Sequence, residues 1–382
     1  MKRQQYLREI FTKPPLLVWC LFVVLTPFYV LPSGLPQPGD LLVLPMVPIA
    51  LAGWNGRLHR SFTKPIRSLG LFIGWVCLVN YGWALAIGNF TILKSYAIFP
   101  IYYLYNGAVF LVALVLYQRY GENLLRFTLY MTLGAVAFQV AASFFYRAGI
   151  YRGNLFFNSP NQLGFYALLA ASIIAMLQRR IAFGLFKASA GLTGCAYLAM
   201  LSGSRAAIAG IAILLFLLLF ANPRVIIAAS LAAVGLTTLG GPVADAISTV
   251  ERRVSTDRNP RLSFVEERGY DRLWKHAEHL AVGAGEGDVT RFQDQKHSPG
   301  ELHSSFATVL FSYGIVGLVL FLIFLFRLGQ GSSLRLLAML LPTLAYTLAH
   351  NGLRSTQLWV LLAFYIVLKL PPPPAPTRAI AS

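Results

Sequence analysis

The sequence predicts an all-α polytopic membrane protein with about twelve transmembrane helices. Hydrophobic residues make up 57% of the chain and charged residues only 12%, a balance that soluble globular proteins do not show. Apolar stretches recur along most of the chain, many of them close to the roughly 17 to 25 residues that cross a bilayer. Lys and Arg concentrate in alternate connections between these stretches, as multi-pass membrane proteins require.

The apolar stretches define the expected organisation. Residues 1–239 are expected to hold nine transmembrane helices and residues 240–304 one external loop. Residues 305–370 would add three helices, and the proline-rich residues 371–382 a disordered cytoplasmic tail. The expected spans are residues 16–31, 41–54, 69–87, 96–117, 124–145, 162–177, 185–201, 206–220, 225–239, 305–326, 334–349 and 355–368.

The distribution of charge predicts the orientation and excludes one class of function. With the amino terminus inside, 18 of the 32 Lys and Arg lie on the cytoplasmic side and five lie in short external connections. This is the positive-inside pattern, so both termini are expected in the cytoplasm. The external loop carries nine basic and eleven acidic residues. The net charge of +18 therefore reflects topology, and nucleic-acid binding has no support.

The connection before the sixth span carries two asparagines at a helix start. Ser159 followed by Pro160 is typical of an N-cap and a first helical position. Asn158 and Asn161 would then stand at the external mouth of the helix. They either complete the cap or offer their amides to sugar hydroxyls or phosphate oxygens.

Arg205 is expected at the external start of the eighth span, after a capping Ser204. One interpretation is that its side chain extends to the membrane interface. The other is an anion site, because the positive end of a helix dipole and an arginine would coincide there.

The external loop is expected to contain one amphipathic helix. Ser263 and Glu266 have capping-box spacing, and apolar residues then recur at helical intervals from Tyr270 onward. Arg268 and Arg272 fall on a neighbouring basic stripe. Such a helix is suited to lie on the bilayer surface over the transmembrane bundle.

The stretch from Glu301 to Gly317 is expected to organise the external surface. It places His303 where the loop returns to the membrane, and His350 and Arg354 lie at the external ends of the last two spans. Glu301, the one carboxylate near His303, is either an exposed loop acid or a substrate-binding residue. Ionisable groups at the membrane surface of a bundle commonly mark function, and arginine suits phosphate recognition. No Asp-x-Asp pair faces this surface, and neither His and acids nor the three cysteines recur at metal-ligand spacing. No metal or cofactor is therefore expected.

Four motifs resemble the O-antigen ligase and O-antigen polymerase superfamily. They are His303-Ser304 followed at a distance by Gly314 and Gly317, the NSPNQLG at 158–164, the SGSRAAIAG at 202–210, and the GAGEGD before the histidine. The resemblance is strongest from about residue 150 to residue 355.

The resemblance implies a glycosyltransferase fold of type C and an undecaprenyl-diphosphate-linked oligosaccharide as donor. By position, Arg205 matches the family's arginine at an external helix start, and His303 matches the histidine that acts on the glycan acceptor. Either Arg272 or Arg268 would match its loop arginine. The implied reaction inverts the anomeric configuration at the periplasmic face of the bacterial inner membrane.

Three functions remain open from the sequence. A polysaccharide repeat-unit polymerase is favoured slightly by the moderate length and single modest loop. An O-antigen ligase would transfer the glycan to lipid A-core instead. A transporter would want polar groups near the bilayer midplane, whereas here they gather at one surface. A flippase and a chain-length regulator are possible partners of the polymerase.

Overall fold

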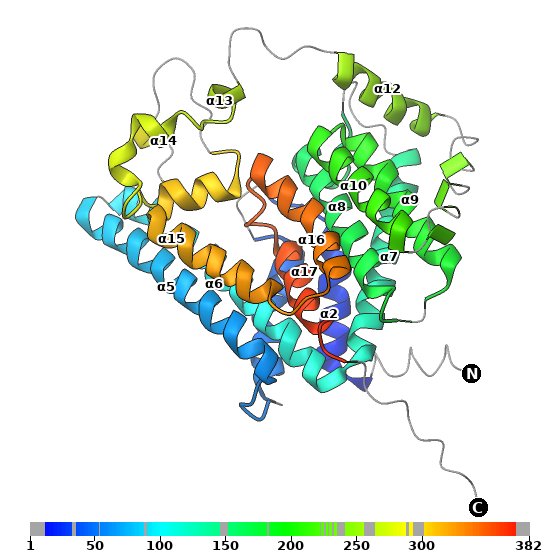
Figure 1. Ribbon diagram of the computed structural model, residues 1–382, viewed down its shortest axis with the longest axis horizontal. Coiled ribbons are helices and arrows are strands. Elements are labelled where there is room, and N and C mark those ends of the chain that lie inside the picture. Colours follow the sequence, from blue (N-terminus) through cyan, green and yellow to red (C-terminus); the bar gives the residue numbers. More distant parts are fainter. Residues whose placement is uncertain are drawn as a thin grey trace, which may run out of the picture.

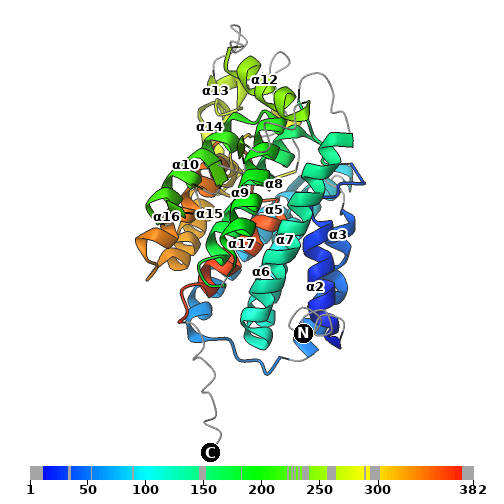
Figure 2. The same ribbon diagram turned by 90° about the vertical axis from the view of Figure 1, so that its right-hand side faces the viewer.

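The computed structural model is a bundle of helices, with α5, α6 and α15 on one side, α7 to α10 on the other, and α16 and α17 between them (Figure 1). Figure 2 shows α12, α13 and α14 together at one end of the bundle. The structure describes residues 12–32, 36–52, 54–87, 90–145, 152–181, 183–221, 223–224, 227, 229–230, 233–234, 241–255, 264–287, 290–292 and 302–371.

Every described element is helical. The α-helices are α2 (Pro14–Leu25), α3 (Pro38–Leu41), α4 (Val43–Ala52), α5 (Arg60–Ile87), α6 (Phe90–Tyr120), α7 (Glu122–Phe145), α8 (Pro160–Leu177), α9 (Leu185–Ser202), α10 (Arg205–Ala221), α12 (Pro242–Ser255), α13 (Phe264–Glu267), α14 (Arg272–Lys275), α15 (Ser305–Gly329), α16 (Leu334–Ala349) and α17 (Thr356–Val367). Two 3₁₀ turns, η1 (Ala277–His279) and η2 (Thr290–Phe292), lie between α14 and α15.

The centre of the bundle consists of helices that are apolar on all sides. Every residue of α8 from Leu163 to Leu177 is buried, as is every residue of α17 from Gln357 to Val367. A helix without a polar face has no side that favours water, so it is stable only when surrounded. Helices α8 and α17 contact each other, and α6, α9 and α16 pack around them.

The outer helices present apolar side chains outward. On α5, Leu71, Leu78 and Leu85 recur at seven-residue spacing and all three are exposed. A long exposed leucine stripe is unfavourable in water and expected against lipid. Among the described residues, five helical segments are long and apolar enough to cross a membrane, namely α5, Ser95–Tyr120 of α6, α7, α8 and α15. The chain is therefore a membrane-embedded helical protein.

Helices occupy eleven of the twelve expected spans. The ninth, at residues 225–239, lies largely outside the described residues, as does the tail after Pro371. Several helices, such as α2 and α17, have only 12 residues, so the number of membrane crossings stays a prediction. The type C glycosyltransferase fold also stays a prediction.

The prediction of a single amphipathic helix after the cap at Ser263 and Glu266 is wrong. The segment is divided into α13, α14 and η1, and Gly269 between the first two has a φ of +71°. That conformation favours glycine and ends a right-handed helix. The expected cap Ser263 lies outside the described residues. The amphipathic helix of this loop is instead α12, which packs on α9 and buries Val243 and Ala246.

Candidate active site

His303 is placed by the start of α15 and by a backbone contact to the loop. Ser304 caps α15, because its Oγ accepts a hydrogen bond from the Ala307 N–H at 3.3 Å. One residue earlier, the backbone N–H of His303 donates to the Arg268 carbonyl at 3.2 Å. The histidine is half-buried at the positive end of a 25-residue helix.

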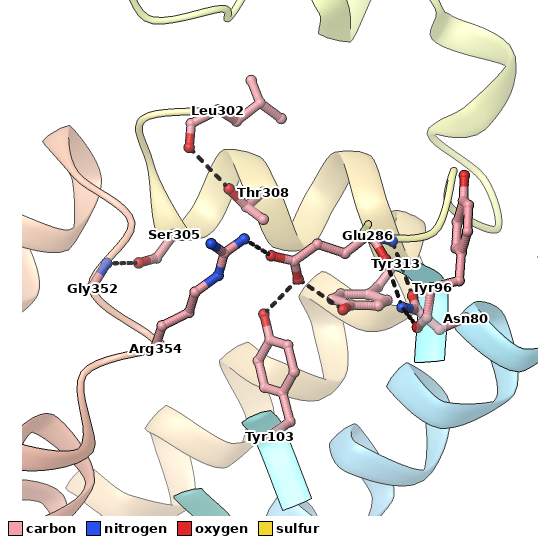
Figure 3. Close-up of polar contacts among 10 residues, drawn as sticks. All are labelled: Asn80, Tyr96, Tyr103, Glu286, Leu302, Ser305, Thr308, Tyr313, Gly352 and Arg354. Atoms are coloured by element: carbon pink, nitrogen blue, oxygen red, sulfur yellow. Dashed lines mark hydrogen bonds and ion pairs between the residues drawn. The ribbon is translucent and has the colours of Figure 1, made fainter. Parts of the chain in front are cut away.

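The turn between α16 and α17 is fastened directly beside His303. The Ser305 hydroxyl accepts the Gly352 N–H at 2.9 Å and donates to the His350 carbonyl at 3.4 Å (Figure 3 draws the first of these bonds). A Cβ at Gly352 would lie 2.8 Å from the Phe165 ring, so glycine permits this close approach. The hydroxyl of Ser305 thus brings the two histidine-bearing segments together.

Two residues of the short segment between α13 and α14 also contact the end of α16. Arg268 donates through Nη1 to the Ala349 carbonyl, and the Tyr270 hydroxyl donates to the Leu348 carbonyl at 2.8 Å. These carbonyls belong to the last turn of α16, where helical carbonyls have no partner within the helix. Arg268 is therefore held against both His303 and the end of α16.

Arg152 enters the site from the other side and is a residue that sequence reasoning missed as a site residue. Its Nε donates to the Ser202 carbonyl at 2.8 Å, and its Nη2 donates to Asn161 Oδ1 at 2.7 Å. Asn161 also accepts, through its carbonyl, the Tyr346 hydroxyl at 3.1 Å. The Tyr346 ring stacks on the His350 ring with centroids 4.7 Å apart.

The first turns of α8 and α10 pack closely at this point. A Cβ at Gly164 would lie 2.7 Å from Ser202 Oγ and 2.8 Å from Ser204 Cβ, so glycine allows the contact. The expected cap Ser159 and first helical residue Pro160 are confirmed, and Ser159 Oγ accepts the Gln162 N–H in a capping box. Arg205 is the first residue of α10 and is exposed, as expected for an arginine at a helix start.

The resulting group, Arg152, Arg268, His303 and His350, is called the cationic cluster. Burial lowers the pKa of His350, and electrostatic interactions with Arg268, His303 and Arg152 lower it further, to about 4. His350 is therefore neutral near pH 7, and the other three side chains lie within electrostatic reach of it. Positive side chains and the amino-terminal ends of α8, α10 and α15 together favour an anion.

A second group of polar side chains surrounds Glu286 (Figure 3). The buried Glu286 carboxylate forms an ion pair with Arg354, Oε1 to Nη2 at 2.7 Å. Its Oε2 accepts hydrogen bonds from the hydroxyls of Tyr313 at 2.9 Å and Tyr103 at 3.2 Å. Asn80 pairs with the backbone of Glu286 in both directions, at 3.0 Å and 2.8 Å. These five residues are called the balanced cluster, because the carboxylate neutralises the guanidinium.

Glu286 reaches this position because a glycine-rich segment packs into a break in α15. Gly314 has a φ of +67° inside that helix, which interrupts its hydrogen-bond ladder. The N–H groups of Ala284 and Gly285 donate to the Phe311 and Ser312 carbonyls, each at 2.9 Å, and the Trp75 indole donates to the Tyr313 carbonyl at 2.8 Å. Backbone carbonyls buried away from water need such partners.

The predicted site residues are thus divided between several places. Asn161, Arg268, His303 and His350 come together, and Arg205 starts the helix that adjoins them. The other predictions lie elsewhere: Asn158 donates to the Leu31 carbonyl at 2.9 Å, Arg354 pairs with Glu286, Arg272 is buried on α14, and Glu301 lies outside the described residues.

Glu286 is the second residue that sequence reasoning missed. In the sequence, Glu286 stands out only as part of the GAGEGD motif, and Glu301 is the predicted acid near His303. The signal that could have found it is a carboxylate between two glycines in a loop that returns to the membrane. Within the residues that the structure describes, no group of three or more His, Cys, Asp or Glu is placed to hold a metal ion.

Comparison with known families supports the resemblance. Residues 190–322 match a family model described as O-antigen ligase, and this range contains Arg205, Arg268, Glu286 and His303. Arg152, Asn161, His350 and Arg354 lie outside the match. No match was found among curated protein sequences. The family match supports membership of the O-antigen ligase and polymerase superfamily, and it points to glycan transfer of the ligase or polymerase type.

Proposed function

We propose, from this family match, that the chain transfers an undecaprenyl-diphosphate-linked oligosaccharide to a sugar hydroxyl at the periplasmic membrane face. The reaction would serve as the polymerisation step of a polysaccharide built from repeat units. The observation that carries the proposal is the cationic cluster, because it gathers basic side chains and helix starts at one end of a lipid-embedded bundle.

The leaving group explains why positive charge is needed. When the bond between the anomeric carbon and the diphosphate oxygen breaks, undecaprenyl diphosphate takes the electron pair and gains negative charge. Arg205, Arg268 and Arg152 would stabilise that charge, and guanidinium groups are suited to phosphate oxygens. Arg268 is preferred over Arg272 because it contacts the turn that carries His350. Transfer is expected to persist when divalent metals are chelated.

The acceptor side of the reaction is assigned to His303. The acceptor hydroxyl attacks the anomeric carbon, a new glycosidic bond forms with inverted configuration, and the hydroxyl proton passes to the imidazole. His350 stays neutral near pH 7 because of its low pKa, so it can exchange hydrogen bonds without adding a charge. Asn161, Asn158 and Arg354 were further candidates for sugar or phosphate contacts, and Asn161 is the one of these three that touches Arg152.

The donor's polyprenyl chain must also reach the site from the membrane. Exposed leucines on α5 and apolar side chains on α15 face outward, so a polyprenyl chain in the bilayer could reach the site from the side. The asymmetry of Lys and Arg assigns the end with α12, α13 and α14 to the periplasm. Both termini would then be cytoplasmic, in the inner membrane of a bacterium.

An O-antigen ligase is the second candidate, because the matching family model carries that description. The two reactions share the donor and differ in the acceptor, which is a lipid-linked repeat unit for the polymerase and lipid A-core for the ligase. The cationic cluster would serve both in the same way.

A gel of surface and lipid-linked glycans tests the proposal. A deletion strain is complemented with wild type, His303→Ala, or His59→Ala as a control histidine outside the site. A polymerase leaves acceptors with one repeat unit in the deletion and His303→Ala strains, and ladders in the other two. Bare acceptors with polymer accumulating on undecaprenyl diphosphate would show the ligase. An unchanged pattern in the deletion strain would reject both and favour transport.

A further inference from the structure

We infer that Glu286 is a positioning residue for glycan transfer, acting through Arg354 to hold the turn between α16 and α17 beside His303. The inference rests on the proposed function, and it concerns a residue that contacts neither the donor nor the acceptor. Figure 3 shows Glu286 extending from the glycine-rich segment to Arg354, which lies in the turn between α16 and α17.

Contacts other than the one with Arg354 hold the carboxylate of Glu286 in position. It is buried to 7% exposure, both hydroxyl bonds end on Oε2, and Asn80 holds its backbone on both sides. Asn80 also donates to the Tyr96 carbonyl at 2.8 Å, which ties this point to α6. Oε1 is therefore presented in one direction, and charge-assisted bonds of this kind are the stronger ones in proteins.

Arg354 is fixed in turn by what surrounds it. Its guanidinium lies over the Phe99 ring at 4.6 Å from the centroid, in addition to the 2.7 Å contact with Glu286. The neighbouring Leu353 carbonyl accepts the Trp359 indole N–H at 2.8 Å. A guanidinium is rigid and planar, so fixing it fixes the backbone that carries it.

The turn between α16 and α17 is thus held by two side chains, Ser305 and Glu286. Ser305 holds it at His350 and Gly352, and Glu286 holds it at Arg354. His350, at one end of this held turn, belongs to the cationic cluster. Removing the Glu286 charge would leave the half-buried Arg354 without this counter-ion, which is more disruptive than removing both partners.

Loss of the Glu286 contact is therefore expected to change kcat and donor KM to different extents. The donor diphosphate is assigned to Arg152, Arg205 and Arg268, which do not bond to Glu286 in any described contact. The alignment of His303 with the acceptor depends on the turn. A displacement on the order of 1 Å can lower a rate by about 100-fold. Glu286→Gln is therefore expected to lower kcat by about 100-fold while donor KM changes less than about threefold.

The experiment measures kcat and donor KM of purified protein in proteoliposomes, per folded molecule, with a synthetic undecaprenyl-diphosphate oligosaccharide as donor. Glu122→Gln is the matched control, because Glu122 forms a 2.6 Å ion pair with Arg180 outside both clusters. It is expected to keep wild-type kcat even if its melting temperature falls. Tyr103→Phe, which removes one of the hydroxyl bonds to Oε2, is expected to lower kcat by roughly threefold to tenfold.

A double-mutant cycle shows whether Glu286 acts through Arg354. The double variant Glu286→Gln/Arg354→Met is expected to have no lower kcat than Arg354→Met alone, because both act on one contact. Additive losses, or a wild-type kcat for Glu286→Gln, would overturn the inference. So would a loss that disappears once rates are expressed per folded protein. If wild-type protein itself transfers no glycan, the proposed function fails instead.

Discussion

The turn between α16 and α17 contributes His350 to the cationic cluster and Arg354 to the balanced cluster, and the two clusters differ in how charge is arranged. Arg354 meets a buried carboxylate at 2.7 Å, so its charge is neutralised within the fold. In the contacts described above, Arg152 and Arg268 donate to carbonyl and amide oxygens, and both lower the pKa of His350. Because the Glu286 carboxylate neutralises it, Arg354 is suited to hold the architecture, whereas we assign Arg152 and Arg268 to the anionic ligand.

This difference separates binding from positioning. The cationic cluster lies at the starts of three helices, where an arriving diphosphate would gain the most. The balanced cluster fills a break in α15 and fastens the turn that carries His350. The predictions that follow test this division.

The largest effect is expected at Arg268, the loop arginine of the cationic cluster. Arg268→Gln removes a charge assigned to the leaving diphosphate and should lower kcat/KM by about 100-fold or more. Arg272→Gln serves as the comparison and should have a smaller effect on transfer per folded protein. Rates in proteoliposomes with the lipid-linked donor decide between them, and the reverse order would assign the role to Arg272.

Gly314→Ala tests whether the break in α15 supports the balanced cluster. The new Cβ would lie 2.4 Å from the Ala281 carbonyl oxygen at a φ of +67°, so the free energy of unfolding should fall by about 1 to 3 kcal/mol. Gly134→Ala on α7 is the control, because a Cβ there meets nothing within 4 Å. Thermal unfolding in detergent measures both, and equal stabilities would contradict the packing described.

Arg152 tests the outer edge of the cationic cluster. Arg152→Lys keeps the charge but loses the two fixed hydrogen bonds, so the donor KM should rise by about tenfold, the equivalent of one charge-assisted bond. Inhibition by inorganic pyrophosphate should weaken in parallel. An unchanged KM together with unchanged pyrophosphate inhibition would place Arg152 in the fold and outside the binding site.

The smallest effect is expected in the pH dependence of stability. The pKa of His350 is lowered from 6.5 to about 4 in the folded protein, so between these values the unfolded chain binds a proton that the folded chain does not. Stability should therefore fall as the pH drops from about 6.5 to about 4. His350→Asn should show a shallower fall in thermal unfolding across this window. If the stability of His350→Asn fell with pH as steeply as that of wild type, the lowered pKa of His350 would be contradicted.

The helices could be predicted from sequence because each follows a local rule. Apolar runs fix their positions, and Ser159 with Pro160 fixes the start of α8. His303 could be recognised because it stands at the point where a polar loop meets an apolar helix. Its neighbours His350 and Arg268 were also candidates, since basic side chains are conspicuous in an apolar sequence.

The contacts that decide roles could not be predicted, because they join distant residues. Glu286 and Arg354 are 68 residues apart, and Arg152 meets Ser202 across 50 residues. Gly283, Gly285 and Gly314 look like ordinary turn or helix glycines in sequence. Only the structure shows that glycine is required at these positions, because a Cβ there would overlap a carbonyl or a ring. Gly269 likewise divided a segment whose apolar spacing favoured one helix.

The most direct test of the central claim separates donor binding from transfer at His303. His303→Ala and wild-type protein are reconstituted with a fluorescent undecaprenyl-diphosphate oligosaccharide, and donor affinity and single-turnover transfer are measured on the same samples. Affinity should stay within about threefold, because the arginines remain, while transfer should fall by about 100-fold to 10,000-fold with loss of the base. Transfer at the wild-type rate by His303→Ala would contradict the account.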